Sequence, residues 1–397
     1  MGVLIKRILN RLDGMILFLL LIFMVISIFC IYSATWKDPE FVGSHNKMMY
    51  FYGLGFAVIF AMMFINYKLL LRFAPLYYLI GVALLVFLYF KGTTLNNAQG
   101  WFTLPGGLSF QPAELCKLLL ILFLAYFLTK RDVETLSLLK EVLPMGVITL
   151  VPFVLVLMQP DLGNAIGYVA IFLAVCWIGH IRYSHALAGL LVIVLVGGTS
   201  LYGYITYHEE VKQYMASKNK EYWLDRIDAV LLPDQASAKA TYHMSQSVIA
   251  IGSGSLKGDG YLQGTSVQRG HVPYTYSDSI FVVVGEEFGF LGASVLLMLY
   301  FLLIYRMMVI ALNLTTKSGI YIILGTAAMF LYQIFENVGM LIGIMPITGI
   351  TLPFISYGGT SLMINMIAIG LVLNIKIYDD VPVEEKLTLG GTPLHGG

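Results

Sequence analysis

One acidic residue stands where a carboxylate can do chemistry. Asp278 lies at the junction between a polar segment and the apolar run that follows it. A carboxylate at this depth is half desolvated, so it can accept a proton from a substrate hydroxyl as a general base. Its position also suits a helix cap, since Ser277 or Asp278 would satisfy an orphan N–H at the start of the next helix. The two roles are compatible.

Three further charged residues lie near the edges of apolar segments. Glu114 and Lys117 are three residues apart and share a helix face, where an ion pair is the simplest arrangement and a contact to a pyrophosphate is the alternative. Asp161 lies in a short turn, as an Asx-turn residue or as an oxygen ligand of Mg²⁺ or Mn²⁺. Asp161 or Asp278 could therefore contribute to a divalent-cation site. Neither residue has a full set of ligands beside it in the sequence.

Two carboxylates follow Asp278 by about two helical turns. Glu286 and Glu287 fall inside an apolar segment, where an ionisable side chain normally faces a partner or a cavity. Lys117 and Arg269 are the expected partners. The same two cations are candidates to stabilise a leaving pyrophosphate.

The remaining motifs are rich in glycine or aromatic residues. The segment 252–260 either brings backbone N–H groups close to a phosphate or forms a flexible surface loop. Ser356, Tyr357 and Gly358 open the last apolar segment, where small residues permit close helix packing. Trp101 suits an anchor at the membrane interface.

The composition places all these residues in a membrane protein. Of 397 residues, 58% are hydrophobic and only 12% charged, whereas soluble domains carry about 25% charged residues. The net charge of +1 gives no reason to expect a nucleic-acid partner, and we find no nucleotide-binding loop.

Apolar runs long enough to cross a bilayer predict an all-α polytopic fold. We count ten candidate spans: 14–34, 48–65, 75–90, 115–128, 142–158, 163–178, 186–207, 288–305, 319–335 and 354–375. Thirteen Lys and Arg residues fall in the segments on one side and three in the short loops on the other. The positive-inside rule then puts both termini in the cytoplasm. It also puts a large loop, 208–278, outside the cell between the seventh and eighth spans.

We expect one membrane domain over residues 1–380 and a flexible cytoplasmic tail or cloning remnant over 381–397. Most of the unusual polar motifs then fall on the outer side of the membrane. This one-sidedness favours chemistry at the outer face of the membrane, with the surrounding lipids as partners.

Taken in order, the motifs resemble the SEDS (shape, elongation, division and sporulation) family. The motifs are Trp101, 110–114 with Lys117, 159–163, Gln246 with 249–254, Asp278 with 285–289, 337–340 and 353–359. The resemblance runs from the first span to the tenth. Two features of the family are missing here, because Gly100 replaces the arginine before the tryptophan and no glutamate lies just upstream of Asp278.

The resemblance implies a peptidoglycan glycosyltransferase that polymerises lipid II during cell-wall elongation. It implies a class B penicillin-binding protein as transpeptidase partner and a divalent cation, and it puts the essential aspartate at Asp278. Inversion at the anomeric carbon is expected. The candidate substrate-binding residues are Trp101, Gln111, Glu114, Lys117, Asp161, Arg269, Ser356, Tyr357 and Gly358.

Two other functions fit the same pattern. A lipid II flippase would also have ten spans and intramembrane charges, but we would expect its polar residues near mid-membrane and on both faces. A non-catalytic scaffold for a penicillin-binding protein would leave Asp278 dispensable.

Overall fold

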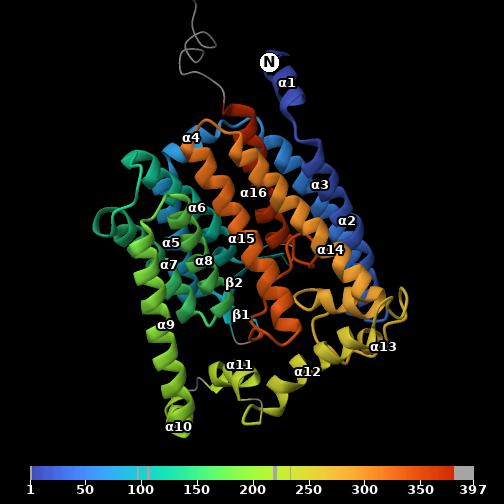
Figure 1. Ribbon diagram of the computed structural model, residues 1–397. Helices are drawn as coiled ribbons and strands as arrows, with labels where there is room; N and C mark the ends of the chain where they lie inside the picture. Colours follow the sequence, from blue (N-terminus) through green and yellow to red (C-terminus); the bar gives the residue numbers. More distant parts are fainter. Residues whose placement is uncertain (1, 96–97, 105–107, 218–220, 233, 380–397) are drawn as a thin grey trace, which may run out of the picture.

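The chain folds into a bundle of long apolar helices (Figure 1). The computed structural model describes residues 2–95, 98–104, 108–217, 221–232 and 234–379, so the predicted tail 381–397 lies outside the described residues. Figure 1 shows α10 to α13 grouped at one end of the bundle, here called the loop end, and α1 at the opposite end, here called the α1 end.

The helices follow the apolar runs of the sequence. In the first half of the chain they are α1 (Gly2–Arg11), α2 (Gly14–Thr35), α3 (Ser44–Met62), α4 (Tyr67–Arg72), α5 (Ala74–Lys91), α6 (Pro112–Arg131), the π-helical turn η1 (Leu138–Val142), α7 (Leu143–Met158) and α8 (Leu162–Ile178). In the second half they are α9 (Tyr183–Thr206), α10 (His208–Ser217), α11 (Glu221–Leu231), α12 (Ala238–Ser253), α13 (Thr265–Gln268), α14 (Ile280–Leu312), α15 (Lys317–Leu341) and α16 (Gly359–Tyr378).

Eight of the described helices are long and apolar enough to cross a membrane. They are α2, α5, α6, α7 together with η1, α9, α14, α15 and α16. The predicted spans 48–65 and 163–178 correspond to the helices α3 and α8, of which α8 is apolar but shorter, with 17 residues. The multi-pass membrane fold is therefore confirmed.

A small sheet at the loop end was not predicted. Strands β1 (Thr93–Leu95), β2 (Ala98–Leu104) and β3 (Leu108–Phe110) pair in the order β1-β2-β3, both pairs antiparallel. The all-α prediction is wrong for this segment. The strands are short and lie in a polar connection, so hydropathy gave no signal for them.

The centre of the bundle is built by the later helices. In α15 and α16 about two thirds or more of the residues in the apolar window are buried, 67% and 72%, and α6 reaches 67%. Helix α9, at the edge of the bundle in Figure 1, buries none of its window. The polar residues of α6 and α15 are therefore enclosed by protein, whereas the surface of α9 is left to the surrounding lipid.

Helix α14 is broken at Gly289, and the glycine-rich segment fills the break. Gly289 has a φ of 64° and a ψ of −162°, which is not helical. The backbone N–H groups of Asp259 and Gly260 donate to the carbonyls of Glu286 and Glu287 over 2.9 and 3.0 Å. The segment 252–260 therefore has a structural role here, since it satisfies backbone groups that the break in α14 exposes.

Candidate active site

Asp278 lies two residues before α14. That helix begins at Ile280 with Ser279 as its N-cap residue, and the Ser279 side chain makes no capping bond. The prediction that Ser277 or Asp278 occupies the N-cap position is therefore wrong. The side chain of Asp278 is half-buried at the loop end of the bundle.

Two neighbours define the environment of the Asp278 carboxylate. The Ser277 hydroxyl donates a hydrogen bond to Asp278 Oδ1 over 2.7 Å. The other oxygen, Oδ2, faces Gly349, where a Cβ atom would lie only 3.3 Å away. Gly349 also has a φ of +76°, so a side chain there would be strained as well as close. Glycine at this position therefore lets the loop backbone lie close to the carboxylate.

Asn337 of α15 holds the backbone of Asp278 in place. Its side-chain amide donates to the carbonyl oxygen of Asp278 over 2.6 Å and to that of Ile350 over 2.7 Å. Asn337 is fully buried. The Asn337 side chain therefore connects α15 both to Asp278 and to the loop 346–353.

Aromatic residues flank Asp278 on another side. Tyr276 stacks on Phe41 with 4.2 Å between ring centroids, and its carbonyl accepts the N–H of Tyr357 over 2.9 Å. Burial and the nearby charge of Asp278 raise the pKa of Tyr276 to about 12. Tyr276 is therefore a neutral phenol at physiological pH. The predicted site residue Tyr357 is brought to the Asp278 segment.

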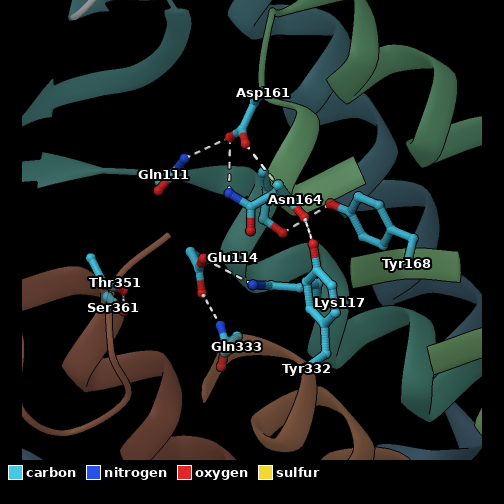
Figure 2. A network of polar contacts seen from close by, with 12 residues as sticks. Gln111, Glu114, Lys117, Asp161, Asn164, Tyr168, Tyr332, Gln333, Thr351 and Ser361 are labelled. Atoms are coloured by element: carbon cyan, nitrogen blue, oxygen red, sulfur yellow. Dashed lines mark hydrogen bonds and ion pairs between the residues drawn. The ribbon is translucent and has the colours of Figure 1, made fainter. Parts of the chain in front are cut away.

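A second polar cluster lies among α6, α8 and α15 (Figure 2). Lys117 Nζ is 2.9 Å from Glu114 Oε1, and both side chains are almost completely buried, as expected for an ion pair at this spacing. Gln333 donates to the other carboxylate oxygen of Glu114 over 3.1 Å. Glu114 is thus held from two helices, while Lys117 is fully enclosed.

Asp161 joins this cluster from the turn before α8. Its Oδ1 accepts the backbone N–H of Asn164 over 3.1 Å, and its Oδ2 accepts the amides of Asn164 and Gln111, each over 2.9 Å. Burial raises the pKa of Asp161 above its ordinary value, with the Glu114 charge adding to the effect. Asp161 is the N-cap of α8, as the Asx-turn interpretation predicts.

A metal bound only by side chains does not fit the donor set. Both oxygens of Asp161 are already occupied by amide donors. Among the residues that the structure describes, no group of three or more His, Cys, Asp or Glu side chains could hold a metal ion. The observed geometry around Asp161 is that of a structural carboxylate.

The loop 346–353 separates and connects the two clusters. On one side, Gly349 contacts the carboxylate of Asp278. On the other side, Thr348 and Ile350 pack so closely against Gly163 that a Cβ atom there would lie 2.8 and 2.7 Å from them. Gly163 directly follows the Asp161 turn. Asp278 and the Asp161 cluster therefore share one loop as a common wall.

The prediction that Lys117 and Arg269 are the partners of Glu286 and Glu287 is wrong. Both oxygens of Glu286 accept backbone N–H groups, from Ser266 over 2.6 Å and from Val267 over 2.9 Å. Glu287 accepts the hydroxyl of Ser33 over 2.5 Å. A carboxylate can be satisfied by backbone donors at the first turn of a helix as well as by a cation. Arg269 lies exposed at the end of α13, outside both clusters.

The other predicted site residues lie in different parts of the structure. Trp101 is half-buried on β2, and its neighbour Gly100 faces the Gln111 amide, since a Cβ atom there would lie 3.7 Å from it. Ser356 is buried, and its hydroxyl accepts the N–H of Leu352 over 2.8 Å, which is a structural role. Gly358 is the N-cap residue of α16.

Sequence reasoning missed two amides that organise the site, Asn164 and Gln333, and it included Asn337 in the motif 337–340 without giving it a role. Asn164 follows Asp161 at helical spacing, and Gln333 and Asn337 lie one turn apart on α15. Polar residues repeated at this spacing inside an apolar helix were the available signal, because they share one face. That face of α15 contacts both clusters.

The fold and the site define a polytopic membrane protein that gathers carboxylates, amides and one enclosed lysine at one end of a helical bundle. The chain belongs to the FtsW/RodA/SpoVE family of cell cycle proteins, whose model matches residues 10–380.

Relatives and solved structures are similar over almost the whole chain. The peptidoglycan glycosyltransferase MrdB of Escherichia coli K12 is 33% identical over 368 residues, which cover 93% of this chain and 94% of that protein. One chain of a solved peptidoglycan synthase complex, whose structure concerns the coordination of polymerization and crosslinking, has a TM-score of 0.74 at 28% identity. That match covers 93% of this chain and 98% of the other. Thermus thermophilus rod shape determining protein RodA has a TM-score of 0.67 at 27% identity and covers 94% and 98%.

Proposed function

We propose that this protein is a peptidoglycan glycosyltransferase that polymerises lipid II at the outer face of the bacterial cytoplasmic membrane during cell-wall elongation. The names of its relatives support the activity. The observation that carries the assignment to a site is Asp278, whose half-buried carboxylate accepts the Ser277 hydroxyl and whose backbone is held by Asn337. The proposed topology has ten spans, α3 and α8 included, with the loop end outside.

Asp278 is the general base of the proposed mechanism. The carboxylate takes the proton of the 4-hydroxyl of the acceptor sugar as that oxygen attacks the anomeric carbon of the donor. The bond from that carbon to the pyrophosphate breaks, and the electron pair leaves with the undecaprenyl pyrophosphate. One displacement inverts an α-linked donor to a β-linked product. The Ser277 hydroxyl stabilises the anionic form of Asp278 and orients it.

Charge developing on the pyrophosphate needs a cationic partner. Lys117 is the candidate, because it is buried on the other side of the loop 346–353 and Glu114 fixes its position. Arg269, Trp101, Gln111 and Tyr357 remain candidate contacts to the longer substrate. We propose that any divalent cation enters with the pyrophosphate, because the oxygens of Asp161 are already occupied. When bound, that cation would neutralise phosphate charge.

The lipid tails of the substrate require access from the side of the bundle. Helix α9 buries none of its apolar window against the rest of the chain. Few side-chain contacts within the chain therefore oppose its displacement, and we propose that the lipid chains pass beside it. A class B penicillin-binding protein is the proposed partner. The similarity to a chain of a peptidoglycan synthase complex supports this proposal.

Polymer synthesis by purified protein tests the role of Asp278. Full-length protein, alone and with its partner, is given labelled lipid II and Mn²⁺, and the glycan products are separated on a gel. We expect Asp278→Asn and Asp278→Ala to lose product by about a hundredfold or more. Asp259→Asn, which changes an exposed acid of the glycine-rich segment, is the matched control and keeps its activity. Thermal unfolding shows that each variant is folded.

Two outcomes would contradict the proposal. Equal polymer from folded Asp278→Ala would remove the base role. If the parent protein made no polymer but moved lipid II between the leaflets of a vesicle, the function would be that of a transporter.

A further inference from the structure

Glu336 of α15 is a buried carboxyl that the proposed mechanism leaves unused. It lies in the C-terminal part of the helix, directly before Asn337, and its side chain is fully enclosed. The hydroxyl of Thr348 donates to its Oε1 over 2.9 Å. Thr348 belongs to the loop 346–353, which follows α15 and folds back against it. Glu336 therefore contacts the loop that forms the common wall of Asp278 and the Asp161 cluster.

Glu336 and Asn337 hold this loop at two alternate residues. Glu336 accepts the hydroxyl of Thr348, and Asn337 donates to the carbonyl of Ile350 over 2.7 Å. Gly349 lies between these two contacts, where a Cβ atom would be 3.3 Å from Oδ2 of Asp278. The loop backbone beside the Asp278 carboxylate is therefore fixed by α15 on both sides.

The contact between the loop and α8 is held from α15 as well. A Cβ atom at Gly163 would lie 2.8 Å from Cβ of Thr348, so the loop packs directly on the start of α8. Tyr332 lies one turn before Glu336 on the same face of α15. Its hydroxyl donates to the carbonyl of Gly163 over 2.7 Å (Figure 2). Loss of the Glu336 contact would therefore free the loop while α8 stays held.

The Glu336 carboxyl lowers the stability of the site that it organises. Its second oxygen, Oε2, is also buried, and no described residue donates a hydrogen bond to it. A buried polar atom without a partner destabilises a fold, whereas replacing both partners of a buried hydrogen bond by apolar groups of the same shape is nearly neutral. An apolar pair at positions 336 and 348 would therefore pack at least as well. What the carboxyl adds is a directional bond that fixes Thr348.

We propose that Glu336 is a positioning residue for Asp278, acting through Thr348 and Gly349. The proposal rests on the proposed function, in which Asp278 is the general base. The bond from Thr348 to Glu336 sets how closely the loop backbone approaches the Asp278 carboxylate. Proton transfer requires that carboxylate to lie within hydrogen-bond reach of the acceptor hydroxyl. A loop that is free to shift lets the carboxylate turn away, while the other contacts to the substrate remain.

Kinetics of polymer synthesis from labelled lipid II test the proposal on the full-length protein. We expect Glu336→Met and Thr348→Val each to lower kcat about tenfold with an unchanged KM. The double variant should fall no further, because both changes break the same bond. Glu336→Gln keeps an acceptor oxygen for Thr348 and should retain most of the parent kcat. Glu141→Met, at a buried glutamate of η1, is the matched control with an unchanged kcat.

Two measurements without catalysis separate positioning from loss of the fold. Hydrogen exchange of the segment 346–353 should be faster in Glu336→Met than in the parent protein. The unfolding midpoint of the double variant should equal that of the parent or exceed it. Values of kcat that simply follow the unfolding midpoints of the variants would reduce Glu336 to a structural role.

Three further results would overturn the proposal. The kcat of folded Glu336→Met could equal that of the parent, the double variant could show the product of the two single effects, or exchange of 346–353 could be unchanged. In each case the parent still makes polymer and Asp278→Asn does not, so the proposed function stands. No polymer from the parent would instead contradict the proposed function, and with it the reaction that Glu336 is proposed to serve.

Discussion

The side-chain amide of Asn337 donates a hydrogen bond to the backbone carbonyl of Asp278 over 2.6 Å. This contact links the C-terminal part of a long buried helix to the residue proposed to move the proton. The second bond of the same amide, to Ile350, holds the loop that packs against the Asp161 turn. The position of the base is thus fixed by α15 rather than by its own helix.

Asn337→Ala removes both hydrogen bonds and allows Asp278 to shift. We expect kcat for polymerisation to fall by about tenfold to a hundredfold, with little change in KM, because the base is misplaced while the substrate contacts remain. Kinetics with labelled lipid II measure the two constants separately. Asn365→Ala, at a buried asparagine of α16, is the control for loss of a buried amide. A fall in kcat of equal size in both variants would contradict the positioning role.

Substitutions in the buried ion pair of α6 can distinguish an effect on stability from an effect on activity. Lys117→Met leaves Glu114 charged and buried, and we expect it to cost about 3 kcal/mol or more of unfolding free energy. Adding Glu114→Gln removes the orphan charge and should restore most of the thermal stability. Activity should stay low in the double variant if Lys117 contacts the pyrophosphate. An active double variant would reduce the pair to a structural role.

Alanine substitutions at two glycines of the glycine-rich segment should differ strongly in their effect on thermal stability. At Gly258 the φ is +80° and a Cβ atom would lie 2.2 Å from the carbonyl oxygen of Glu287. Gly258→Ala should therefore cost about 1 to 3 kcal/mol from the backbone conformation alone, and the clash adds to this. Gly252→Ala, with nothing within 4 Å of its Cβ position, should leave the midpoint of thermal unfolding unchanged or slightly raised. Similar midpoints for both variants would contradict this account of the break in α14.

His243 makes the loop end sensitive to acid. Its Nε2 lies 3.1 Å from the hydroxyl of Ser279, next to Asp278, and burial lowers its pKa from 6.5 to about 4. Between these values the unfolded chain binds a proton that the folded chain refuses, so stability falls as the pH drops from about 6.5 to 4. The full effect is up to about 3 kcal/mol.

Unfolding midpoints at pH 7 and pH 5 measure this effect. We expect a smaller drop for His243→Gln than for the parent protein, and an unchanged drop for His271→Gln, at an exposed histidine. Equal drops in all three proteins would assign the acid sensitivity to other groups.

Local sequence patterns predicted the helices but not the contacts that organise the site. Hydropathy located the apolar helices because each run is continuous. It could not show that 254–260 fills the break at Gly289, since that contact depends on residues about thirty positions apart. The partners of Glu286 are backbone N–H groups, which no side-chain pattern reveals. The sheet was missed because its strands alternate over only a few residues.

Among the polar residues too, some contacts could be predicted from the sequence and others could not. The ion pair of Glu114 and Lys117 and the turn at Asp161 could be predicted, because their partners lie within a few residues. Arg269 was grouped with Glu286 by charge alone, but both oxygens of Glu286 accept the backbone N–H groups of Ser266 and Val267 instead. Gln333 reaches Glu114 from another helix, a contact that only the packing of α6 against α15 creates.

The unburied surface of α9 has a consequence for how this chain tolerates change. A helix that contacts no core is constrained within the chain by its length and hydropathy, so one aliphatic residue can replace another there without leaving a void. In α16, where most side chains are enclosed, the same exchange alters packing. Substitutions should therefore accumulate freely along α9 and rarely along α16, although the two helices are similarly apolar.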